Sequence, residues 1–112
     1  MVQQTWIDEH TARQNYSRHA EFTVTQADNN AADALNLSDL GLNRINKISL
    51  VVELYDAYVK VDGTATVGAT SMLIPAGEGY FDDGVNIKTN ISFINASAGN
   101  NARIRGIAWG YD

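Results

Sequence analysis

Hydrophobic and polar residues alternate along several short stretches of the chain, which is the pattern of β-strands with one buried face. The clearest stretch runs from Ile48 to Tyr55, where every even-numbered residue is aliphatic. We therefore predict a central strand over these residues, with Leu54 among the side chains that face the core. A second alternating run predicts a strand at Ala20–Thr25, again with the even-numbered residues inside.

The C-terminal run Ala102–Trp109 also alternates, with small or aliphatic residues at its even positions and Trp109 on the other face. Shorter strands are predicted at 57–61, 64–67, 71–74 and 89–94. The turn signal Asp62-Gly63 predicts a hairpin that joins the first two of these strands. Residues 26–46 are rich in Asn and Asp, and they predict a long loop whose leucines cover the core, with one helical turn near 38–42.

This spacing of short strands and turns, without a long helix, is typical of an all-β sandwich or barrel. We predict a small antiparallel β-sandwich at residues 20–112, preceded by an extended N-terminal arm at residues 1–19. The arm carries Trp6, Ile7 and Tyr16 among polar residues and shows neither strand nor helix periodicity. A short helix or a disordered terminus are the alternatives for this segment.

Composition narrows the classes of partner. The chain has 8 Lys and Arg against 13 Asp and Glu, a formal net charge of −5, and its basic residues form no stripe. Nucleic acid is therefore not an expected partner. A membrane is not expected either, because no long apolar run is present. Cysteine is absent, which removes disulfides and thiolate chemistry.

Residues suited to catalysis are scarce. His10 and His19 are the two histidines, and no metal-binding spacing surrounds them. The acidic turns at Asp62 and at 82–83 are explained by turn chemistry, with a calcium site as the weaker alternative. Glu53 has no evident acidic partner, and we expect it either on the solvent face or facing an arginine such as Arg103 or Arg105 across the strands. We predict no enzyme, no catalytic residue, no metal and no cofactor.

Six aromatic residues are spread over the predicted strands and turns, and they suit either packing and interface contacts or stacking on sugar rings: Tyr55, Tyr58, Tyr80, Phe81, Trp109 and Tyr111. Packing is the simpler interpretation. In the strand that ends with Trp109, the small residues Gly106 and Ala108 leave room for a close neighbour.

Three segments, Ser71–Phe81, Gly84–Ile94 and Ala102–Trp109, resemble small cysteine-free β-sandwich proteins of tailed bacteriophages, the capsid decoration or cement proteins. The resemblance implies a jelly-roll-like fold, a place on the capsid surface of the virion, contact with the major capsid protein and a homotrimeric state. It also implies a structural role, in which the protein bridges neighbouring shell subunits. The expected interface residues are Trp6, Ile7, Tyr16 and Trp109. The alternative is a carbohydrate- or receptor-binding module of a phage tail or a cell surface.

Overall fold

Strands dominate the part of the chain that the computed structural model describes, which comprises residues 18–26, 32–68 and 70–111. The expected interface residues Trp6, Ile7 and Tyr16 lie outside these residues. Within the described ranges, no helix has the length and apolar character needed to cross a bilayer. In chain order, the elements are β1 Arg18–Thr25, β2 Asp33–Asn36, α2 Leu37–Leu40, β3 Arg44–Glu53, β4 Ala57–Val61, β5 Met72–Ile74, β6 Gly79–Asp82, β7 Asn90–Asn95 and β8 Arg103–Tyr111.

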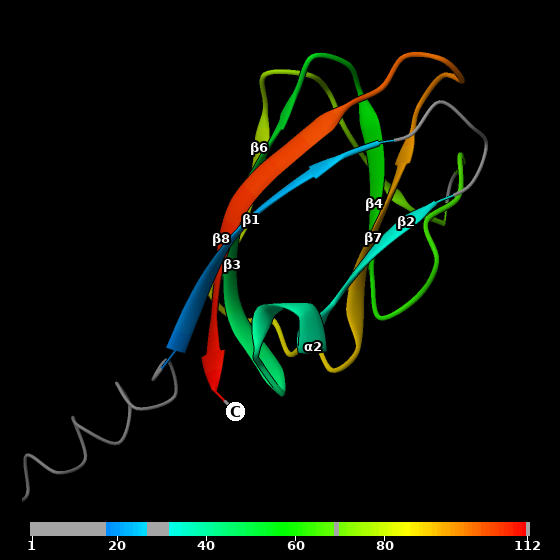
Figure 1. The fold of residues 1–112 in the computed structure, drawn as a ribbon. Coiled ribbons are helices and arrows are strands. Elements are labelled where there is room, and N and C mark those ends of the chain that lie inside the picture. The colour runs from blue at the N-terminus through cyan, green and yellow to red at the C-terminus, as the bar shows by residue number, and fades with distance from the viewer. Residues whose placement is uncertain (1–17, 27–31, 69, 112) are drawn as a thin grey trace, which may run out of the picture.

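The described strands form two four-stranded antiparallel sheets packed face to face (Figure 1). The first sheet has the order β1-β8-β3-β6, and the second has the order β2-β7-β4-β5. The first strand thus pairs with the eighth, the second with the seventh, the third with the sixth and the fourth with the fifth. A long antiparallel ribbon rolled into a sandwich produces this order, which is that of a jelly roll. The predicted fold class is confirmed.

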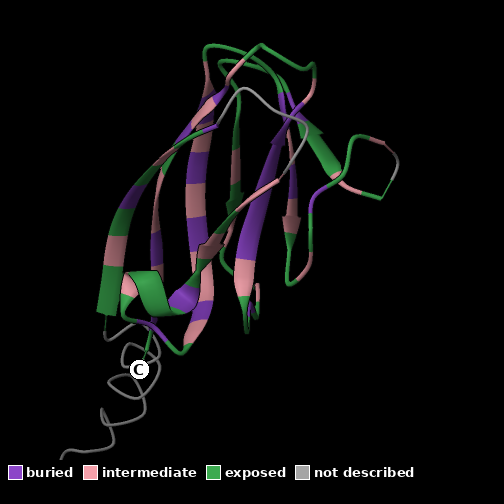
Figure 2. Cartoon of the chain, turned by 45° about the vertical axis from the view of Figure 1, so that its right-hand side comes forward, coloured by how far each residue is buried: buried purple, intermediate pink, exposed green. Residues whose placement is uncertain are grey.

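Aliphatic side chains and Phe93 fill the space between the two sheets. Ile48, Leu50 and Val52 of β3 and Ile104 and Ala108 of β8 are buried, as the alternation predicted. Figure 2 shows that buried positions concentrate in the strands, whereas the loops at both ends of the sandwich are mostly exposed. Each large aliphatic side chain removed from water in this way contributes roughly 1.5–3 kcal/mol to folding.

The bounds of several strands differ from the predicted ones, and the differences at β3 and β1 affect individual predictions. β3 begins at Arg44, ahead of the predicted start, and ends at Glu53, which lies opposite the first residue of β8, Arg103. The ladder has no further partner there, so the predicted burial of Leu54 is wrong: this residue has a φ of 77° and is 58% exposed. β1 begins at Arg18, so the last two residues assigned to the arm belong to the first sheet.

The hairpin predicted at Asp62-Gly63 is also wrong, because β4 pairs with β5 and β7 instead of with residues 64–67. Asp62 has a φ of 53°, and its carboxylate accepts a hydrogen bond from the backbone N–H of Thr89 at 2.7 Å. This contact directs the chain toward β7 and away from a return along β4. The next residues then cross β7, where the N–H of Ala65 donates to the hydroxyl of Ser92 at 2.9 Å.

β2 and α2 occupy the segment that was predicted as a loop. β2 pairs with β7, which places Leu35 opposite Ile91. α2 is the predicted helical turn, and Asp39 in its first turn accepts a hydrogen bond from the N–H of Asn36 at 3.1 Å. Gly41 ends the helix with a φ of 71°, a conformation that glycine adopts without steric cost.

Candidate functional site

One face of the first sheet points away from the core, and its side chains form the candidate site. Its arrangement follows from the strand register: Trp109 of β8 pairs with Lys47 of β3, while Ser49 of β3 pairs with both Ile107 of β8 and Phe81 of β6. We call this surface the outer face. It is defined by Glu21, Thr23, Lys47, Ser49, Val51, Glu53, Phe81, Arg103, Arg105, Ile107 and Trp109.

Two aromatic rings flank a lysine on the outer face. The Nζ atom of Lys47 lies 4.5 Å from the centre of the Trp109 ring and 5.7 Å from the centre of the Phe81 ring. The Phe81 side chain is 60% exposed, whereas Trp109 is half-buried beneath the lysine. A cation held against aromatic faces gains roughly 0.5–1 kcal/mol at exposed sites and more when it is desolvated. A partner that covers this group would therefore strengthen a contact that already exists.

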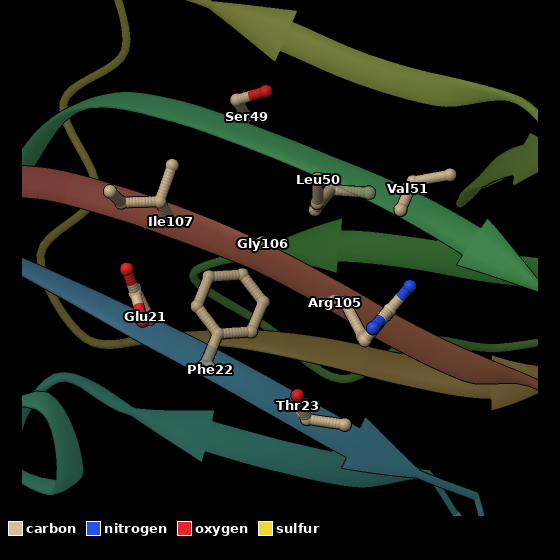
Figure 3. A pocket seen from close by; sticks show the side chains of 9 residues that line it. All are labelled: Glu21, Phe22, Thr23, Ser49, Leu50, Val51, Arg105, Gly106 and Ile107. Carbon is tan, nitrogen blue, oxygen red and sulfur yellow. The ribbon is translucent and has the colours of Figure 1, made fainter.

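A shallow hollow of about 510 Å³ lies beside this group, over the middle of β8 (Figure 3). Glu21 and Thr23 of β1 line one side, and Ser49 and Val51 of β3 line the other. Its floor follows the backbone of Gly106. The hollow mixes apolar and polar groups and is open to solvent, which suits contact with a protein surface better than enclosure of a small molecule.

Charged groups occupy the end of the outer face at which β8 begins. Glu53 accepts hydrogen bonds from Nε of Arg103 at 2.8 Å and from a terminal nitrogen of Arg105 at 2.7 Å. The Arg105 and Arg103 hydrogen bonds hold the pKa of the Glu53 carboxyl below its usual value. The predicted pairing of Glu53 with an arginine across the strands is confirmed, and both arginines share this carboxylate.

The acidic turns at Asp62 and Asp82 make different hydrogen bonds. The Asp62 carboxylate accepts backbone N–H groups of Lys88 and Thr89, and the Asp82 carboxylate accepts the Tyr80 hydroxyl at 3.0 Å. Burial and the Asp82 hydrogen bond raise the pKa of Tyr80. Across the described ranges, no three His, Asp or Glu side chains are grouped so that they could hold a metal ion. The calcium alternative therefore gains no support from Asp62 and Asp82.

A smaller hollow, of about 170 Å³, lies at one end of the sandwich. Leu54, Tyr55 and Asp56 line it together with Asn100. Tyr55 is 47% exposed there, because the chain leaves the sheet after Glu53. The Oδ1 atom of Asp56 already accepts the N–H of residue 76 at 2.7 Å.

Trp109 lies on the outer face, as its position in the alternating run predicted, and its role as a contact residue stays a prediction. Lys47 is a residue of the outer face that the sequence pattern did not single out. Lys47 lies just before the clearest alternating stretch and continues its period-two pattern on the outer face with Ser49, but the pattern does not show that strand pairing brings Trp109 and Phe81 beside it. Phe81 was noted as an aromatic residue, but its exposure depends on the position of β6 at the edge of the sheet.

The fold therefore defines a small jelly-roll β-sandwich with an exposed, partly aromatic sheet face. No family model, no curated protein and no solved structure matches this chain.

Proposed function

We propose that this chain is a structural protein of a bacteriophage virion, which decorates the capsid and bridges neighbouring shell subunits through protein–protein contacts. The observation that carries the proposal is the outer face, where the exposed ring of Phe81 and the half-buried ring of Trp109 flank Lys47. Aromatic side chains dominate the binding energy of many protein interfaces. The fold supports the proposal in a general way, because jelly rolls are frequent among viral capsid proteins.

The mechanism is mechanical and needs no reaction. A protein that binds the assembled shell and not its separated subunits stabilises the shell through mass action. Each added contact must break before neighbouring subunits can move apart. The mixed charges of Glu53, Arg103 and Arg105 suit the polar rim of such a contact, around the apolar centre at Phe81 and Trp109.

Cosedimentation with capsids tests the proposal. The probe is the empty capsid of the phage that encodes the chain, purified without this protein. We expect the unmodified chain to sediment with these shells, and we expect Phe81→Ser to weaken binding by at least about tenfold, as for loss of an interface hot spot. Val67→Ser is the matched control, because Val67 is 57% exposed but lies in the connection between β4 and β5. An unmodified chain that ignores the shells would overturn the proposal.

The N-terminal segment is tested in the same assay. Deletion of residues 1–17 removes Trp6, Ile7 and Tyr16 and leaves β1 intact, since this strand begins at Arg18. We expect the deletion to weaken shell binding, because the predicted arm supplies part of the contact. Unchanged binding would remove the arm from the proposal while leaving the outer face in it.

A second candidate function is carbohydrate binding, and the hollow at the end of the sandwich favours it. Tyr55 offers an exposed ring beside Asp56 and Asn100, and ring stacking combined with carboxylate or amide contacts is a chemistry that recognises sugars. Jelly rolls also include lectin domains. A glycan array distinguishes the two candidate functions. Carbohydrate binding would be favoured over capsid decoration if the chain bound a specific glycan, if Tyr55→Ala abolished this binding, and if the chain did not bind shells.

A further inference from the structure

Among the residues that the structure describes, the two sheets have four edge strands, and β1 is longer than the other three. β1 has 8 residues, compared with 4 for β6, 4 for β2 and 3 for β5. Proteins usually protect a free edge with a short strand, charged side chains and lysine above all, a proline, a bulge, or a covering helix or loop. β1 contains neither proline nor lysine, and its pairing with β8 continues without a register shift. The first sheet therefore presents a long, regular edge (Figure 1).

The register identifies which backbone groups of β1 point outward from this edge. The N–H of Gln26 donates to the carbonyl of Ala102 at 2.9 Å, in continuation of the β1–β8 ladder. In an antiparallel ladder, residues that bond to the partner strand alternate with residues that point away from it. The even-numbered residues of β1 thus bond to β8, while His19, Glu21, Thr23 and Thr25 direct their N–H and C=O groups away from the sheet. All four are exposed.

We propose that two copies of this chain pair their β1 strands in antiparallel fashion, so that the two first sheets become one continuous eight-stranded sheet. The partner is a second copy because the free edge is complementary to itself, whereas pairing with another edge strand of the sandwich would use at most half of its length. Like edges close at two copies around a twofold axis. The proposal replaces the trimer that the resemblance implies, and it does not depend on binding to capsids.

Charge and length select the register. The odd-numbered residues of one β1 strand must lie opposite odd-numbered residues of the other, so that their outward N–H and C=O groups form hydrogen bonds. Glu21 opposite the partner's Glu21 would place like charges together, which destabilises a strand pair. Shifting the pairing places Glu21 opposite the partner's Thr23 and His19 opposite the partner's Thr25. This register pairs all four outward residues of each strand, whereas a further shift of the partner strand in the same direction would pair fewer. The twofold axis of the dimer passes beside Phe22.

Both outer faces lie on the same side of such a sheet, because the twofold axis is perpendicular to it. Two copies of the aromatic group at Phe81, Lys47 and Trp109 would then be presented together. If the proposed function holds as well, each dimer carries two equivalent contacts for the shell, and linked contacts raise apparent affinity without any new interaction.

The mass of the full chain in solution is the first test, measured by light scattering from micromolar to millimolar concentration. We expect twice the chain mass of 12.2 kDa. We expect Thr23→Glu to weaken the dimer by at least about tenfold, because it places a carboxylate opposite the partner's Glu21 on both sides of the axis. The same change leaves the fold intact, because position 23 lies opposite Arg105 within the chain. Adding Glu21→Lys should restore the dimer.

Two controls make the test specific. Thr64→Glu adds the same charge at an exposed position outside β1 and should leave the mass unchanged. The chain has no cysteine, so the double variant Glu21→Cys with Thr23→Cys should form a covalent dimer on oxidation. The paired Cα atoms would be about 5.5 Å apart, within the range of a disulfide. Each single cysteine would lie about 8 Å from its copy and should not crosslink. A monomer, a trimer or a dimer that ignores Thr23→Glu would overturn the proposal.

Discussion

Replacing Gly106 with alanine would place a methyl group where β8 has no room for one. A Cβ atom at this position would lie 2.8 Å from Cζ of Phe22 and 2.9 Å from Cβ of Leu50. Its nearest neighbour would be the carbonyl oxygen of Ser49, at a still shorter separation. Phe22 can rotate or shift, but the carbonyl belongs to the β3 backbone and is fixed by the sheet. The strand pair would have to separate locally to admit the methyl group.

The expected cost follows from the kind of atom that must move. Overpacking a well-filled core typically costs about 1–3 kcal/mol. Because a backbone group blocks the new methyl, we expect Gly106→Ala to lie near the upper end, at about 3 kcal/mol. For a domain of this size, that loss corresponds to a fall in Tm of roughly 10–15 °C. Marginal stability makes this a large fraction of the free energy of unfolding.

Urea unfolding followed by circular dichroism measures the effect. Gly84→Ala is the matched control, because a Cβ atom there would meet only Asp82 Oδ1 at 3.6 Å, an ordinary contact. We expect the control to remain within about 0.5 kcal/mol of the unmodified chain. The reasoning would be refuted if Gly106→Ala matched the control. It would also be refuted if Phe22→Leu fully restored the stability of Gly106→Ala, since relief of the ring contact leaves the Ser49 carbonyl in place.

Three further predictions concern polar contacts. Glu53→Gln should lower Tm at pH 7, and the difference from the unmodified chain should vanish well below pH 4.5. A carboxyl whose pKa is lowered by folding stabilises the protein at pH values above its ordinary pKa and loses this contribution as the pH falls. Thermal unfolding across pH measures the difference, and a constant difference would contradict the prediction. As the pH rises above 10.0, the Tyr80→Phe variant should lose less stability than the unmodified chain. The raised pKa of Tyr80 means that the folded state favours the protonated phenol, so ionisation of the phenol favours unfolding. Equal losses of stability would contradict the raised pKa. Asp62→Ala should cost about 1–3 kcal/mol in urea unfolding, because the backbone N–H groups of Lys88 and Thr89 lose their acceptor. Asp62→Asn should cost less, because it keeps one side-chain oxygen, and equal costs of the two variants would contradict this explanation.

The local pattern of hydrophobic and polar residues was sufficient to predict a strand and its inner face where only one face of the strand is buried. Alternation located most of β3 and β8 and assigned their inner faces, because burial of every second side chain leaves a direct record in the sequence. It also placed Glu53 and Trp109 outside. It failed at Leu54, where the aliphatic pattern continues past the end of the ladder, since the end of β3 is set by the start of β8. It failed as well at Asp62-Gly63, a turn signal that does not specify which strand the chain meets next.

The sequence by itself determined that this protein is an all-β sandwich and which residues of β1, β3 and β8 face inward, and it offered an arginine as one of two surroundings for Glu53. Those properties depend on periodicity and on charge type, which neighbouring residues carry. Only the tertiary structure decided that Lys47, Phe81 and Trp109 meet, and that β1 is a free edge. These features come from pairing between strands that are distant along the chain. A period of two fixes the face of each strand but contains no information about its neighbour.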